Sequence, residues 1–325
     1  MRIVRRAFVN WLLTACALLP CVSGQAAPEF PNRPIRLVIS FPPGSTSDLL
    51  ARRLGEQAGK ALSQPVVVES RPGAQGVVAA RAVLSAPRDG YTLFLGTNSS
   101  HAANVYMVKE LGYDPLKDFT PITQFTINPL LLVVNAAMPV HNVKEFVRYA
   151  KERPGKLSYG TGNSGGLVAA QMLKSQAGID AVAVNYPGTA QAMSDLVAGR
   201  LDFMMVDPVV IRSIAQTGKV RVLGLTSKQR LPSMPDVVPL AEGGLPDYDY
   251  ASWGGLFAPA GLPPDVTRRL SQAFGNAVGD PGTVKYLSEL GMIATSSTPE
   301  EFRVFVQGQI AFWGRLTKEA GLAAL

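Results

Sequence analysis

Short apolar runs alternate with amphipathic stretches along most of this chain. Residues 35–41, 65–69 and 91–96 are apolar segments of strand length, and after the first of them Leu49, Leu50, Leu54 and Ala58 recur at helical spacing. The same alternation resumes after residue 142, where Asn142 and Glu145 form a capping-box pair ahead of a helix. Strands separated by helices predict βαβ units with a largely parallel sheet, so we expect an α/β protein.

Two extended segments divide the chain. Residues 121–135 are long enough to pass from one lobe to another, and residues 220–226 are the expected return crossing. We therefore predict one lobe from residues 27–130 and 227–325, and a second from residues 131–226. Near the end, prolines after Asp280 and Thr298 start two helices, and the last of these places an aromatic stripe in the core, formed by Phe302, Phe305, Ile310 and Trp313.

The N-terminus has the form of a secretory signal peptide at residues 1–26. Three arginines precede a mostly apolar run, residues 8–22, that is too short to span a bilayer, and Gly24 and Ala26 give the cleavage spacing. We expect cleavage after Ala26 and export to the periplasm. The alternative is a lipid anchor at Cys16, because residues 13–16 resemble a lipoprotein cleavage box. Cleavage after Ala26 removes both cysteines, leaving no disulfide and no thiol nucleophile.

Charge and composition exclude several functions. The formal net charge of +7 falls to +4 when the three leader arginines are removed, and the remaining basic residues are dispersed, which argues against nucleic-acid binding. Beyond the leader there is no second apolar segment of membrane-spanning length. Two histidines and no mature cysteine leave a transition metal without its usual ligands, although a carboxylate-only calcium site stays open. We expect no cofactor.

The glycine-rich loop at residues 160–166 matches two catalytic patterns. Gly162 to Gly166 fits the G-x-S-x-G nucleophile elbow around Ser164, but that mechanism needs a histidine after the serine, and His101 and His141 both precede it. An exported serine hydrolase is the distant alternative. Gly160 to Gly165 also fits G-x-G-x-x-G, yet Asp180 precedes the next strand instead of following it, so a ribose-binding acid is missing. We expect no enzyme activity.

Both strand-to-helix loops have the chemistry of an anion cradle. A helix N-terminus presents free backbone N–H groups and the positive end of the helix dipole. The first cradle consists of Gly44, Ser45, Thr46, Ser47 and Asp48; the second includes Thr161, Gly162, Asn163, Ser164 and Gly165. For Ser45 and Asp48 an ordinary helix cap is an equally good interpretation. Thr97, Asn98, Ser99 and Ser100 follow the third strand, at the edge where ligands bind α/β sheets.

The order of several short motifs resembles the Bug, or TctC-type, solute receptors of tripartite tricarboxylate transport. The resemblance runs from Pro31 to Leu322. Its marks are Arg33-Pro34-Ile35, Phe41-Pro42-Pro43-Gly44 with Asp48, Arg71-Pro72-Gly73-Ala74, Asp89-Gly90-Tyr91, Tyr113-Asp114-Pro115 with Asp118-Phe119, Glu242-Gly244-Leu245, Trp253 and Phe257-Ala258-Pro259.

This resemblance implies a two-lobed type II periplasmic-binding-protein fold, in which crossing strands act as a hinge and the lobes close on a carboxylate. It adds Tyr186, Gly188, Thr189 and Asp207 to the expected ligand site, although Asp207 equally suits a cap for the helix at Pro208. Leu167 and Pro187 stand where the family often has histidine and a basic residue, which favours a monocarboxylate or a less charged ligand. The implied partners are the membrane subunits of a tripartite transporter or, alternatively, a membrane sensor kinase.

Overall fold

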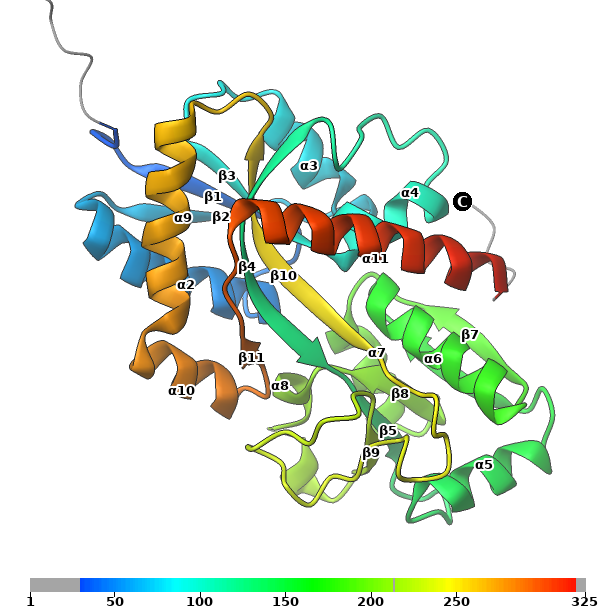
Figure 1. Cartoon of the computed structure of the whole chain (residues 1–325). Helices are drawn as coiled ribbons and strands as arrows, with labels where there is room; N and C mark the ends of the chain where they lie inside the picture. The colour runs from blue at the N-terminus through cyan, green and yellow to red at the C-terminus, as the bar shows by residue number, and fades with distance from the viewer. Residues whose placement is uncertain (1–29, 213, 320–325) are drawn as a thin grey trace, which may run out of the picture. The chain divides into compact units, whose positions relative to one another are not determined.

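The computed structural model describes residues 30–212 and 214–319, so the predicted leader, its cleavage point and the alternative anchor Cys16 lie outside the described residues. The described residues from 33 onward belong to one compact unit. Within it the strands form two sheets, one of six strands and one of five (Figure 1). The alternation of strands and helices predicted from the sequence is confirmed.

The six-stranded sheet holds the beginning and the end of the described chain. Its order is β11-β4-β10-β3-β1-β2, with β1 (Ile35–Ile39), β2 (Val66–Ser70), β3 (Thr92–Thr97), β4 (Phe119–Pro129), β10 (Ala251–Pro259) and β11 (Ile293–Ala294). Strands β1, β2 and β3 are parallel, whereas β10 runs antiparallel between β3 and β4. The carboxyl ends of β1 and β3 therefore meet at one edge, which places their following loops together.

Helices cover both faces of this sheet. Leu95 of β3 faces the same side as Leu50 of α2 (Thr46–Leu62), and on that side α9 (Pro264–Gly279) packs beside α2. The preceding residue, Phe94, points to the other side, into a core shared with α3 (Val77–Leu84) and α11 (Pro299–Glu319). Phe302 and Trp313 of α11 are fully buried there, which confirms the core role predicted for the aromatic stripe.

The five-stranded sheet is built from the middle of the chain. Its order is β7-β6-β8-β5-β9, with β5 (Leu131–Asn135), β6 (Leu157–Thr161), β7 (Ala181–Asn185), β8 (Phe203–Val206) and β9 (Val220–Leu225). Phe146 of α5 (Val143–Lys151) packs edge-on against Phe203, beneath α6 (Ser164–Ala177). Met193 and Leu196 of α7 (Thr189–Val197) fill the other face with Met204.

The chain passes between the sheets at two neighbouring places. Strand β4 leads into β5 with only Leu130 between them, which agrees with the long extended segment predicted at residues 121–135. The predicted return crossing at residues 220–226 is wrong, because β9 pairs along its length with β5 as an edge strand of the five-stranded sheet. The chain returns later, at Tyr250. Thr226 joins the two places: its N–H donates to Leu130 O (2.8 Å), and its carbonyl accepts from Tyr250 N (2.9 Å). The exact lobe limits stay a prediction.

The remaining helices are short: α4 (Asn104–Met107), α8 (Pro208–Ile211) and α10 (Pro281–Glu289), with 3-10 turns at Ala74–Gly76 and Ala215–Thr217 and a π turn at Ser99–Ala103. None of the helices in the described ranges combines the length and the apolar character that a membrane span requires.

Candidate functional site

The first predicted cradle is a well-formed helix start. Ser45 is the N-cap of α2, and its Oγ accepts a hydrogen bond from Asp48 N at 3.3 Å. The Asp48 carboxylate in turn accepts from Gly44 N at 2.9 Å and pairs with Arg52. Burial opposes ionisation of Asp48, but the bonds from Arg52 and Gly44 outweigh it and lower its pKa. The Asp48 carboxylate is therefore already bound to neighbouring groups of the chain, which supports the capping interpretation.

The second cradle starts its helix earlier than expected. The sequence assigns residues 160–166 to a glycine-rich loop and so starts the helix at Leu167, but α6 begins at Ser164 because Asn163 caps it, accepting from Gly166 N at 2.8 Å. Ser164 and Gly165 therefore lie in the first helical turn, where their N–H groups are not used by the helix itself. The cradle is an N-terminal turn, and its glycines keep side chains away from the helix end.

Among the described residues, no hydrogen bond joins Ser164 to either histidine. Its side chain is buried, and its Oγ lies 3.4 Å from Gln75 Oε1, on the other sheet's α3 entry turn. His101 instead places Nδ1 2.9 Å from Ser100 Oγ, with its ring stacked on Phe257. Burial lowers the pKa of His101 to about 3, so that ring stays neutral near neutral pH. Neither Gln75 beside Ser164 nor the buried His101 beside Ser100 matches the histidine base that a nucleophilic serine needs.

Two buried donors converge on Gly165. A side chain at Gly165 would begin 3.3 Å from the Tyr250 hydroxyl and 3.4 Å from Asn98 Nδ2. Both groups are almost fully buried, and neither has a hydrogen-bond partner among the described residues. Unpartnered buried donors are costly, so their convergence indicates a place for an acceptor. Asn98 was predicted from its position after β3; Tyr250 was missed, because its segment carries no motif and only the fold brings it to α6.

Asp207 connects the two cradles. It follows β8 at the N-cap position of α8, but its side chain makes no capping bond, so the alternative interpretation as a cap is wrong. Its carboxylate instead interacts with the Thr46 side chain at the start of α2. Burial raises the pKa of Asp207 to about 6, against the lowering effect of the Thr46 bond. Burial also raises the pKa of Tyr250, and the nearby charge of Asp207 adds to that effect.

The loop after β3 lies behind this meeting point. Thr97 N donates to Ser100 Oγ at 3.1 Å, and Ser99 and Ser100 are buried in the π turn. Gly76 approaches this loop and β1 closely, since a side chain there would begin 3.0 Å from Ser40 Oγ and 3.4 Å from Ser100 Cβ. Hydrogen bonds within the loop therefore hold it in place, and its Asn98 side-chain amide is the donor that faces Gly165.

The residues after β7 lie beside the second cradle. A side chain at Gly162 would begin 2.2 Å from Thr189 N, so glycine is required where the two loops touch. Asn163 Nδ2 lies 3.5 Å from Thr189 Oγ1, in the turn where Gly188 caps α7. Tyr186 donates its hydroxyl to Asp195 on α7 at 2.6 Å. The structure therefore brings Gly162, Gly188 and Thr189 together and binds the Tyr186 hydroxyl to α7.

Two further side-chain arrangements concern the metal and dinucleotide hypotheses. Among residues 30–212 and 214–319, no three His, Cys, Asp or Glu side chains gather as a metal site would require. Asp180 is two-thirds exposed and lies 3.8 Å from Lys174, so it does not approach the glycine loop as a ribose-binding acid would. What the described groups offer is hydrogen bonding: two helix N-termini, an amide, a phenol and one carboxylate with a raised pKa.

Comparison with known proteins gives one consistent family. Residues 50–322 match the model of the tripartite tricarboxylate transporter family receptor, TctC. A UPF0065 protein encoded in a tcbD–tcbE intergenic region of a Pseudomonas species is 34% identical over 304 residues, covering 92% of this chain and 90% of the relative.

Solved structures agree with the sequence match. The Rhodopseudomonas palustris protein Rpa4515, solved with adipate, superposes with a TM-score of 0.87 at 32% identity and covers 91% of this chain and all of its own. MatC from the same organism, solved with malate, gives a TM-score of 0.81 at 31% identity, covering 88% of this chain and 99% of its own. The two-lobed α/β fold implied by the resemblance is confirmed.

Proposed function

We propose that this chain, which belongs to the tripartite tricarboxylate transporter receptor (TctC) family, captures a small organic carboxylate between its two sheets and delivers it to membrane transporter subunits. The observation that carries the proposal is the convergence at Gly165. There the first turn of α6 faces the Asn98 amide and the Tyr250 hydroxyl, neither of which has a partner in the described ranges. A carboxylate oxygen accepts several N–H and O–H bonds at once, which satisfies these donors.

The start of α2 supplies the opposite side of the proposed grip. Thr46 touches Asp207, and Asp207 lies close enough to Tyr250 to affect its pKa, so the N-termini of α2 and α6 are linked through these side chains. Ligand groups placed there would meet two positive helix ends. Two related receptors carry adipate and malate, which supports a carboxylate as the ligand class.

The proposed ligand carries fewer charges than a tricarboxylate. Asp207 is a carboxylate within the site, and burial rather than a neighbouring cation dominates its pKa. Asp48, the other acid of the first cradle, is already paired with Arg52. A second ligand carboxylate beside Asp207 would meet like charge, whereas a hydroxyl or amino group would donate to it. We therefore propose a monocarboxylate, or an acid whose second polar group is a donor.

A thermal-shift panel of mono-, di- and tricarboxylic acids tests this function, with native mass spectrometry of gently purified protein to identify a retained ligand. An acid at one hundred times its Kd stabilises the folded protein by about 2.7 kcal/mol. Asn98→Asp should abolish that stabilisation, because it replaces the inward donor by an anion. Asn276→Asp, the same change at an exposed position on α9, should leave it intact. Stabilisation by none of the acids would overturn the proposal.

A further inference from the structure

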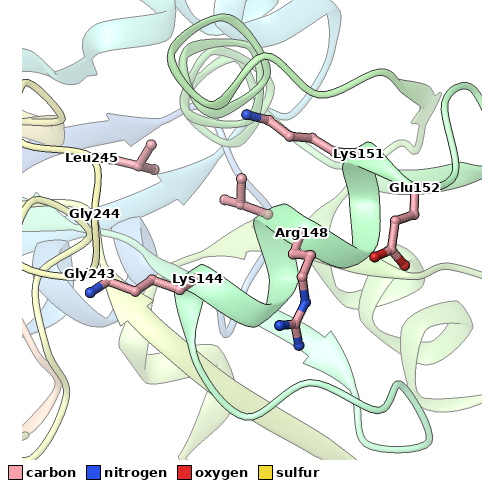
Figure 2. A pocket seen from close by; sticks show the side chains of 8 residues that line it. Lys144, Arg148, Lys151, Glu152, Gly243, Gly244 and Leu245 are labelled. Atoms are coloured by element: carbon pink, nitrogen blue, oxygen red, sulfur yellow. The ribbon is translucent and has the colours of Figure 1, made fainter.

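Helix α5 carries a basic hollow on the outside of the five-stranded sheet. The hollow encloses about 420 Å³ and lies between α5 and the loop at residues 243–245. Figure 2 shows Lys144 extending toward Gly243, with Arg148 and Lys151 spreading from the same helix. These three cations, which we name the α5 basic row, are all exposed.

The acids around the α5 basic row are bound to other groups. Glu152 pairs with Arg153, Glu242 pairs with Arg230, and Glu145 is used by the helix cap through Asn142 and His141. Among the described residues no ion pair includes Lys144, Arg148 or Lys151. Glu145 and Arg148 interact through charge without forming an ion pair, so the three cations of the row present a net positive charge to the outside.

The floor of the hollow is apolar and firmly built. Val147 and Leu245 line it, and Leu245 is almost fully buried. Its loop is fixed by bonds from Gly243 N to Pro239 O and from Leu245 N to Leu240 O. A side chain at Gly243 would begin 2.9 Å from Val143 Cβ, so glycine keeps the loop against α5 and leaves the hollow open.

The spacing of the row selects the size of its partner. Lys144 and Lys151 are seven residues apart, which corresponds to a rise of about 10 Å along a helix. A single small anion cannot contact both ends of such a row. A chain segment that carries several carboxylates can, and apolar residues between its acids would fill the floor between Val147 and Leu245.

We infer that the α5 basic row and its apolar floor dock an acidic, partly apolar segment of a partner protein. The inference rests on the proposed function, since a receptor must present an outer surface to the membrane subunits that receive its ligand. This surface is separate from the ligand site, and the Tyr248 hydroxyl ties its loop to α6 through Ala169 O at 2.5 Å. The loop thus contacts both α5 and α6, two helices that cover the five-stranded sheet.

A designed peptide tests the docking surface. A fluorescent peptide of about 12 residues, roughly 18 Å long as a helix, carries glutamates at every third or fourth position with leucines between them. We expect fluorescence anisotropy to show binding that weakens with added salt. A peptide with glutamine in place of every glutamate should bind at least tenfold more weakly. The glutamate peptide should likewise bind at least tenfold more weakly to the triple variant Lys144→Glu, Arg148→Glu, Lys151→Glu.

A matched variant controls for net charge. Lys109→Glu, Lys285→Glu and Lys318→Glu makes the same change of charge at exposed positions away from α5 and should retain affinity within twofold. An equal loss of peptide affinity in both triple variants would overturn the inference. It would also be overturned if phosphatidylglycerol vesicles or inorganic phosphate bound at the α5 basic row and the peptide did not. Carboxylate thermal shifts measured on the same variants report the ligand site separately, so failure of the proposed function is distinguishable.

Discussion

Replacing Asp207 by asparagine should raise the free energy of unfolding at neutral pH. At acidic pH the variant and the unmodified protein should be equally stable. Burial raises the pKa of Asp207 from 3.8 to about 6. That change corresponds to about 3 kcal/mol between the protonated and ionised forms in the folded state. Because the side chain keeps some exposure, we expect a measured effect of about 1 to 3 kcal/mol.

The sign follows from proton binding. The folded state holds the proton of Asp207 up to about pH 6, whereas the unfolded chain releases it near 3.8. The stability that the protonated group provides is therefore complete below 3.8 and is lost as the pH rises toward 6. Asparagine does not titrate, so Asp207→Asn should match the unmodified protein at low pH and exceed it above about pH 6.

Urea unfolding followed by tryptophan fluorescence measures this difference, because Trp253 and Trp313 are both buried. The two proteins are compared at about pH 4, 5, 6 and 7, so that all other titrating groups cancel. Asp236→Asn, which removes one charge at an exposed position, is the matched control. A difference between Asp207→Asn and the unmodified protein that stays constant with pH, or that has the opposite sign, would refute the reasoning.

Three further predictions follow from individual contacts. Gly165→Leu should abolish carboxylate-induced thermal shifts without unfolding the protein, since its side chain would occupy the space beside Asn98 and Tyr250; a retained shift would contradict the site. Asn163→Ala should cost about 1 kcal/mol in urea unfolding by removing the α6 cap, and an unchanged midpoint would argue against that role. Trp313→Ala should cost about 3 to 5 kcal/mol in the same assay, because the side chain is fully buried; a loss below 1 kcal/mol would contradict its core position.

The sequence predicted those parts of the fold that depend on local patterns. The strands around residues 35, 66 and 92 and the cap at Asn142 were predicted because strand length, helical spacing and capping pairs are encoded by neighbouring residues. The start of α6 was predicted three residues late, because three consecutive polar and glycine residues look like loop, while the Asn163 cap makes them the first helical turn. Local patterns are weakest where loop and helix share the same residue types.

The site was predicted in part for the same reason. The two cradles and Asn98 follow strands directly, so their positions could be inferred from strand ends. Tyr250 was missed because it has no distinguishing neighbour in the sequence. Tyr250 reaches Gly165, 85 positions earlier in the chain, only because the chain returns to the six-stranded sheet at that point.

The sequence by itself determined the α/β class, the two helix-start cradles, the aromatic core of α11 and the family resemblance, because each depends on short segments or on their order. Only the tertiary structure decided that β9 is an edge strand of the five-stranded sheet, that the chain crosses back at Tyr250, and that Asp207 interacts with Thr46. The sequence alone suggests that Asp207 caps a helix, but the fold brings Thr46 to it from the start of α2. Pairing and burial between distant segments fix these features, and no local pattern encodes them.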